Sequence, residues 1–214
     1  MFSSGQKRTV QLLILALTFV VPHRAEAVAY CALRDPVFAM QSFFPDFSSY
    51  RSYLGIVGEE LREVLEEKLP YELHFNEFGK HTLYVAFNGQ QATGLVHART
   101  EKGDWGLDEL IWSLNMDLTV RDFRFQRSRS RWQEEVQSPA FKEILNGKDF
   151  NELLLLLSAD GSELSMQYPD LPPGADRLAA TVIRSALKTI IVTDHVWSNQ
   201  LQLDMADRLS LRGQ

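Results

Sequence analysis

The stretch EKGDWGLDEL at residues 101–110 has the residue types best suited to a binding site. Gly103 and Gly106 flank Asp104 and Trp105 within it. Glycine permits positive φ and lets another group approach the backbone closely. The pattern therefore predicts either close approach of another group beside a large ring, or a turn between two strands whose tryptophan closes one end of the core. Glycine and tryptophan are common near turns, which favours the turn when this stretch is taken alone.

A second group of interest is basic. Five arginines lie between Arg121 and Arg131, although the chain has a formal net charge of −6. At the end of this segment Arg127, Arg129 and Arg131 alternate with serine, and we call these three residues the arginine strip. The strip could bind an anion, such as a phosphate or an acidic partner. It could equally be a charged strand edge that discourages aggregation.

The remaining polar residues do not combine into a catalytic or metal-binding motif. No two histidines have the i, i+4 spacing of a helical metal pair. Asp108 and Glu109 are adjacent, so a strand would direct them to opposite faces. Ser185 and His195 lack the glycine-flanked turn that usually presents a nucleophilic serine. We therefore predict no catalytic residue and no metal site, and leave open whether the protein is an enzyme.

The first 27 residues have the pattern of a secretory signal peptide. Lys7 and Arg8 precede the apolar run VQLLILALTFVV, and Ala25-Glu26-Ala27 offers small residues for cleavage. The run is shorter than the roughly 20 residues needed to cross a bilayer. We expect cleavage after Ala27 and a mature chain that is not itself transmembrane.

The mature chain would have 214 − 27 = 187 residues, enough for one domain with an extension. Cleavage removes Lys7, Arg8 and Arg24 against Glu26, which takes the net charge from −6 to −8. Nucleic acid is not expected as a partner of so acidic a chain. Cys31 is the only cysteine, so no internal disulfide can form.

Hydrophobic periodicity divides the mature chain into two parts. Residues 28–78 form a helical N-terminal extension: 54–69 has a helical apolar period that ends at Pro70, and the aromatic segment 36–50 should pack on the main domain. Residues 79–197 form an α+β domain. It begins with an antiparallel meander of four strands near 82–87, 92–99, 107–114 and 118–127. Short helices near 139–147 and 149–158, a longer helix at 176–192 and a C-terminal tail at 198–214 should follow.

The segment LYVAFNGQQATGLVHARTEKGDWGLDELIWSLNMDLTVRDFRFQ, together with SPAFKEILNG and the final helix, resembles the FMN-binding domain family. That family includes periplasmic subunits of the Rnf complex and of the sodium-translocating quinone reductase, and the nitrous-oxide reductase regulator. The resemblance covers about residues 79–192. It implies a periplasmic protein with an FMN cofactor, bound covalently or noncovalently.

The resemblance also implies a set of cofactor-binding residues. Family members carry flavin on the threonine of a Ser/Thr-Gly-Ala-Thr motif, where this chain has Leu178-Ala179-Ala180-Thr181. Thr181 and Ala180 would lie near the phosphate, at a helix start where free N–H groups favour anions. Gly103 and Gly106 would let the backbone pass the isoalloxazine ring, and Trp105 would supply a stacking face.

Two departures from the family bear on this expectation. The motif has lost its first hydroxyl residue and its glycine, and the arginine strip replaces a usual Glu-Thr-Pro-Gly turn. Two function classes therefore stay open. One is a flavin-dependent electron-transfer module that serves a membrane redox complex or another periplasmic protein. The other is a cofactor-free interaction or assembly protein that uses the same fold.

Overall fold

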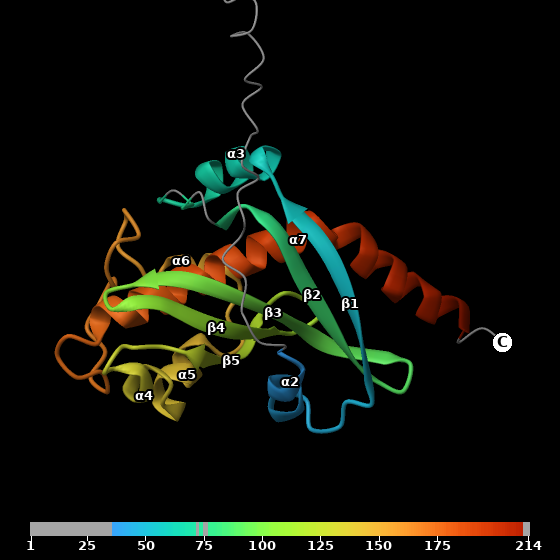
Figure 1. Ribbon diagram of the computed structural model, residues 1–214, viewed down its shortest axis with the longest axis horizontal. Helices are drawn as coiled ribbons and strands as arrows, with labels where there is room; N and C mark the ends of the chain where they lie inside the picture. The colour runs from blue at the N-terminus through green and yellow to red at the C-terminus, as the bar shows by residue number, and fades with distance from the viewer. Residues whose placement is uncertain (1–35, 72, 75–76, 212–214) are drawn as a thin grey trace, which may run out of the picture.

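The computed structural model describes residues 36–71, 73–74 and 77–211. Within them, a sheet of five antiparallel strands has the order β1-β2-β3-β4-β5, so each strand pairs with its neighbour in sequence. The strands are β1 (Ser49–Val57), β2 (Gly79–Asn88), β3 (Gln91–Gly103), β4 (Gly106–Leu114) and β5 (Val120–Arg127). The long helix α7 (Asp176–Leu211) crosses one face of this sheet (Figure 1). The predicted α+β class, with its antiparallel meander and C-terminal helix, is confirmed.

Strand β1 was not expected from the sequence. The helical period that begins at Leu54 predicted a helix there, but Leu54 and Val57 belong to β1, and helix α3 (Glu59–Lys68) begins only after Gly58. A strand and a helix are both compatible with this segment, because a short apolar run fits the two-residue period of a strand as well as the 3.6-residue period of a helix. All nine residues of β1 pair with β2. The predicted boundary between residues 78 and 79 therefore falls between two paired strands of one sheet.

The main core lies between the sheet and α7. Its largest buried side chains include Trp112 and Phe123 from the sheet and Trp197 from α7. The indole N–H of Trp112 donates to Ser185 Oγ at 2.9 Å, which ties β4 to the third turn of α7. Helix α7 extends well beyond the predicted end at residue 192 and includes most of the predicted tail.

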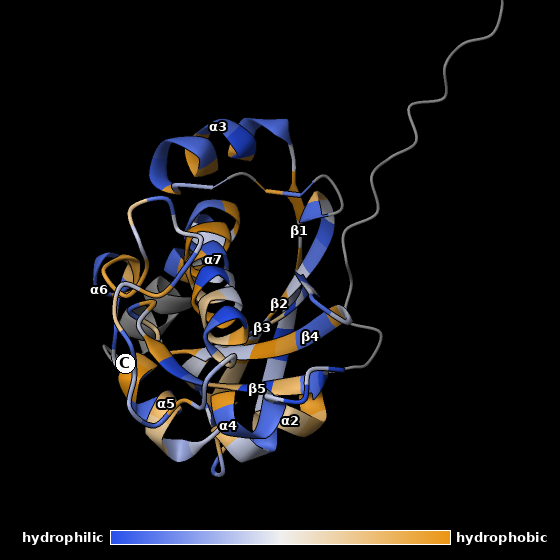
Figure 2. Cartoon of the chain, turned by 90° about the vertical axis from the view of Figure 1, so that its left-hand side faces the viewer, coloured by the Kyte–Doolittle hydropathy of each residue, from blue (hydrophilic) through white to orange (hydrophobic). Residues whose placement is uncertain are grey.

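A smaller core lies on the opposite face of the sheet, under α2 (Val37–Phe43) (Figure 2). Met40, Phe43 and Phe44 are buried there against Ala86, Val96 and Ile111 of β2, β3 and β4. The expectation that the aromatic segment packs on the main domain is confirmed.

The short helices begin where the sequence places capping residues. Ser138 Oγ accepts from Phe141 N at 3.3 Å and caps α5 (Pro139–Leu145), which follows α4 (Gln133–Val136). Asp149 and Glu152 form a reciprocal capping box on α6 (Phe150–Leu154), which is shorter than the run 149–158 suggested. These helices support the β5 side of the sheet and the first turns of α7.

Within the described part of the chain, no helix combines the length and apolar character needed to cross a membrane. The predicted signal peptide at 1–27 and Cys31 lie outside the described residues.

Candidate anion site between the β3–β4 hairpin and helix α7

A small cavity of about 80 Å³ lies where the β3–β4 hairpin meets the first turns of α7. It brings Gly103 and Thr181 together, although they are far apart in the sequence. Its lining comprises Lys102, Gly103, Asp104, Asp108, Ser130, Arg177, Leu178, Thr181 and Arg184. The volume suits a group of phosphate size, and a flavin ring would have to lie outside it.

Gly103 leaves room for a buried carboxylate. A Cβ at this position would lie 2.9 Å from Asp108 Cγ, too close for the present packing. Asp108 is almost fully buried and accepts a hydrogen bond from Ser128 Oγ at 2.6 Å. Burial raises the pKa of Asp108, with smaller contributions from the nearby carboxylates of Asp104 and Glu101, while the Ser128 hydrogen bond opposes the shift.

The hairpin turn itself is tight. Gly103 and Gly106 are paired across it, and Gly106 has a φ of 129°, which favours glycine. Trp105 is 70% exposed at the tip of this turn and is not among the cavity residues. The stretch is therefore a turn, but its tryptophan does not close the core. The indole face is accessible for stacking instead.

Thr181 lies in the second turn of α7, because the helix begins at Asp176. Its N–H is therefore not one of the free donors at the helix start, where sequence reasoning had placed it. The Thr181 hydroxyl donates to Arg177 O at 3.0 Å and accepts from Arg184 Nη2 at 2.9 Å. Ala180 is fully buried and does not line the cavity.

The cavity has three cationic and two acidic residues in its lining. Arg177 pairs with Asp104 at 3.1 Å, and both side chains are largely exposed, so this pair is weak and easily rearranged. Arg184 is fixed more firmly, because its Nη1 also donates to the carbonyls of Gly161 and Ser162 at 3.2 and 3.3 Å. Lys102 adds a third positive charge. Three basic residues against two acidic ones give the lining of the cavity an excess of one positive charge.

The arginine strip is not one continuous surface. Arg127 pairs with Glu109 at 2.7 Å, and Arg131 lies over the ring of Trp132 at 4.4 Å. Arg129 is exposed, and its Cδ lies 3.9 Å from where a Gly106 Cβ would be. Arg129 therefore lies beside Gly106, at the turn of the β3–β4 hairpin.

Sequence reasoning missed a buried ionic cluster, which we define as Glu77, Arg99, Glu101 and Lys188. Arg99 contacts Glu77 at 2.6 Å and Glu101 at 3.4 Å. Lys188 contacts Glu77 at 2.7 Å and also forms an ion pair with Glu101. All four side chains are less than a tenth exposed. Two cations face two carboxylates, so the cluster is balanced in charge.

Two buried histidines adjoin the ionic cluster. His81 Nε2 lies 2.9 Å from the carbonyl of Glu77 and must donate to it, so neutral His81 accepts at Nδ1 from His97 Nε2, 3.2 Å away. Burial, assisted by Arg99, lowers the pKa of His81 from 6.5 to about 4, although its hydrogen bond to Glu77 opposes the shift. Burial also lowers the pKa of His97, with smaller contributions from His81 and Arg99. Both rings are therefore neutral at physiological pH.

One sequence signal could have revealed the cluster. His97, Arg99 and Glu101 alternate along β3, so they point to the same face of the sheet, and Lys188 interrupts the apolar stripe of α7. Along α7, Arg177, Thr181, Arg184 and Lys188 are spaced i, i+4, i+7 and i+11 and share one face. This polar face leads from the cavity to the buried cluster.

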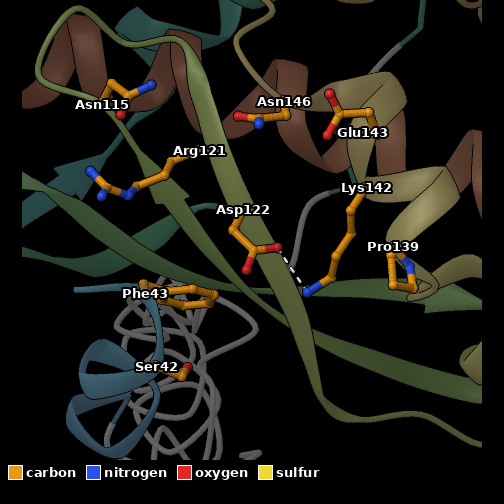
Figure 3. A pocket seen from close by; sticks show the side chains of 9 residues that line it. All are labelled: Ser42, Phe43, Asn115, Arg121, Asp122, Pro139, Lys142, Glu143 and Asn146. Atoms are coloured by element: carbon orange, nitrogen blue, oxygen red, sulfur yellow. Dashed lines mark ion pairs between the residues drawn. The ribbon is translucent and has the colours of Figure 1, made fainter. Parts of the chain in front are cut away.

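A larger and more open hollow of about 620 Å³ lies elsewhere, between α2, the β4–β5 turn and α5 (Figure 3). Its main charged groups already have partners. Lys142 pairs with Asp122 at 2.8 Å, and Arg121 lies over the Phe44 ring at 4.6 Å. Both basic groups of this hollow are therefore engaged, and Glu143 adds a carboxylate to its lining, so the hollow suits an anion less well than the cavity beside Thr181.

The described residues contain no group of three or more His, Cys, Asp or Glu side chains arranged to hold a metal ion. Comparison with known proteins adds no relative, because no family model matches the chain and no curated protein matches its sequence.

Proposed function

We propose that this protein is a periplasmic flavin-binding module that transfers electrons for a membrane redox system. In this proposal the cavity beside Thr181 receives the phosphate end of an FMN. The observation that supports it is that Gly103 and Thr181 line one cavity together with three basic side chains. The resemblance to the FMN-binding domain family implies a flavin-binding role for both residues.

The donor set of the cavity fits a phosphate. Arg177 and Lys102 offer charged N–H groups, and Ser130 adds a hydroxyl. To bind a phosphate, Arg177 would lose only its solvent-exposed ion pair with Asp104. The Arg184 guanidinium would orient the Thr181 hydroxyl, because it already donates to that oxygen.

Outside the cavity, Trp105 and Arg129 border the hairpin tip. The indole would cover one face of a flat ring, and exclusion of water by that contact would help to hold the ring. When bound, the flavin supplies the electron transfer, and the protein sets its position and potential.

A cofactor-free interaction protein is the second candidate, and one observation favours it. The Thr181 hydroxyl already donates one hydrogen bond and accepts another, and the carboxylates of Asp104 and Asp108 line the same cavity. In this case Arg129 and Arg131 would bind an acidic partner through exposed charges, and binding would weaken as salt rises.

Titration of the purified protein with FMN, followed by flavin fluorescence, tests the proposal. The wild type should bind, and Arg177→Gln should weaken binding by roughly tenfold, as expected for loss of one charge-assisted hydrogen bond. Arg62→Gln, at a half-buried arginine of α3 away from the cavity, is the matched control and should bind like the wild type. Equal binding by Arg177→Gln would place the phosphate elsewhere.

A further inference from the structure

The two carboxylates that line the cavity at the β3–β4 hairpin are held to very different degrees. Asp108 is almost fully buried, accepts a hydrogen bond from Ser128 Oγ at 2.6 Å and packs against Gly103, so its carboxylate is fixed in place. The Asp104 side chain is 51% exposed. In the part of the chain that the structure describes, its one polar partner is Arg177, whose Nη1 donates to Asp104 Oδ1 at 3.1 Å.

Asp104 lies at a position from which its side chain can turn away. Gly103 and Gly106 pair across the hairpin, so Asp104 and Trp105 form the turn between the two strands. Exposed side chains change rotamer on the picosecond to nanosecond timescale. The Asp104 carboxylate can therefore leave Arg177 without any movement of β3 or β4.

The position of the Asp104 carboxylate sets the charge of the cavity. While Asp104 is in place, the three basic residues of the lining face two acidic ones. When Asp104 turns toward solvent, the same three basic residues face Asp108 alone, and the excess of positive charge rises from one to two. A phosphate monoester carries close to two negative charges at about pH 8. The lining without Asp104 therefore matches the charge of a phosphate group better than the lining with it.

A carboxylate and a phosphate also compete for the same donor. A guanidinium binds either group through charge-assisted N–H···O hydrogen bonds. Because Arg177 Nη1 already donates to Asp104, a phosphate oxygen gains this donor only by displacing the carboxylate. An exposed ion pair of this kind contributes little free energy, so its displacement costs little.

We propose that Asp104 is a built-in competitor for the cavity: its carboxylate holds Arg177 in the ligand-free protein, and a phosphate group displaces it toward solvent. The inference rests on the proposed function only in that the cavity accepts a phosphate group, and it does not require a flavin. Since Asp104 is tethered beside Arg177, its effective concentration is on the order of millimolar or higher. Anions that Arg177 binds no better than a carboxylate are therefore kept out at lower concentrations.

Titration of the purified protein with inorganic phosphate at about pH 8, followed by NMR chemical shifts, tests the proposal. Asp104→Asn should bind phosphate roughly fivefold more tightly than the wild type, because it removes both the competing ion pair and the repulsion of the ligand. Asp46→Asn, at an exposed residue between α2 and β1, is the matched control and should bind like the wild type. A phosphate affinity of Asp104→Asn that does not exceed that of the wild type overturns the proposal, as does the absence of phosphate binding in both.

The same substitution in an Arg177→Gln chain tests whether Asp104 acts through Arg177. In that chain Asp104→Asn should raise the phosphate affinity by at most about twofold, because the donor for which the carboxylate competes has been removed. An undiminished gain there would mean that Asp104 acts only through its general negative charge, and it would overturn the displacement.

A parallel titration with FMN separates this inference from the proposed function. Tighter phosphate binding by Asp104→Asn in a protein that binds no FMN supports the competitor and refutes only the flavin function. Binding of both phosphate and FMN with no effect of Asp104→Asn refutes only the competitor.

Discussion

Arg184 Nη2 donates to Thr181 Oγ1 at 2.9 Å, so the hydroxyl proposed to face a phosphate is already oriented by a cation one turn along α7. The same hydroxyl donates to the carbonyl of Arg177 at 3.0 Å. Any group that reaches the Thr181 oxygen must therefore compete with, or add to, two existing hydrogen bonds.

Thr181→Val removes this hydroxyl at nearly constant volume. We expect flavin content to fall sharply, with a loss of stability of about 1 kcal/mol for the missing hydrogen bonds. Flavin released from equal amounts of protein by denaturation measures the effect. The matched control is Thr189→Val, which removes a buried hydroxyl that donates to Ser185 O on the same helix, away from the cavity. Equal flavin loss in both variants would show a general effect of altering α7.

Gly103→Ala should destabilise the protein by about 1 to 3 kcal/mol, because the added methyl group must displace the buried Asp108 carboxylate. Urea denaturation measures the change in the free energy of unfolding. Gly58→Ala is the control, since no atom lies within 4 Å of its added Cβ. In the Asp108→Ala background the same substitution at Gly103 should cost much less. An unchanged cost there would mean that Asp108 does not explain the glycine.

Lys188→Met leaves Glu77 and Glu101 with Arg99 as their only cation in the buried ionic cluster. Breaking a buried ion pair from one side typically costs about 3 to 5 kcal/mol, and we expect a loss of that size. Arg62→Met breaks a surface pair with Glu59 and should cost about 1 kcal/mol or less. Thermal and urea denaturation compare the two variants. Similar small losses in both would mean that water reaches the cluster.

The buried histidines predict that stability falls as the pH drops. The pKa of His81 is about 4 in the folded chain, against an ordinary value of 6.5, which we take for the unfolded chain. As the pH falls, the unfolded chain therefore takes up a proton before the folded chain does. Stability should therefore be constant above about pH 6.5 and decline between about pH 6.5 and about pH 4, by roughly 3 kcal/mol from His81 alone. His97 acts in the same direction.

Unfolding free energies measured across this pH range give the slope. His81→Gln should flatten it, whereas His195→Gln, an exposed residue of α7, should leave it unchanged. A wild type whose stability is constant between these pH values would contradict the burial of neutral histidines.

The sequence predicted the meander and the helix caps because those patterns are local. Alternation sets each strand, and Ser138 and Asp149 cap helices within three residues of themselves. Strand β1 was missed because the apolar run that starts at Leu54 fits the period of a strand as well as that of a helix. Its pairing with β2 depends on tertiary contacts that a local pattern does not show. The meeting of Gly103 with Thr181 was expected only through the family resemblance.

The buried ionic cluster could not be assigned from local patterns in the same way. Its charges come from the segment before β2, from β3 and from α7, and only packing brings Glu77 within 2.7 Å of Lys188. Charged residues in a strand ordinarily indicate a solvated face. Here Arg99 and Glu101, two residues apart in β3, instead lie on the face of the sheet that α7 covers, and both are buried.

The flavin proposal is tested most directly by the protein purified from its native host, examined by visible absorption and by the mass of the denatured chain. We predict flavin absorption in the folded protein. An added mass that survives denaturation, and is absent from Thr181→Val, would indicate a covalent link at that residue. A colourless protein of unmodified mass that also takes up no added FMN would contradict the proposal and favour the cofactor-free interaction protein.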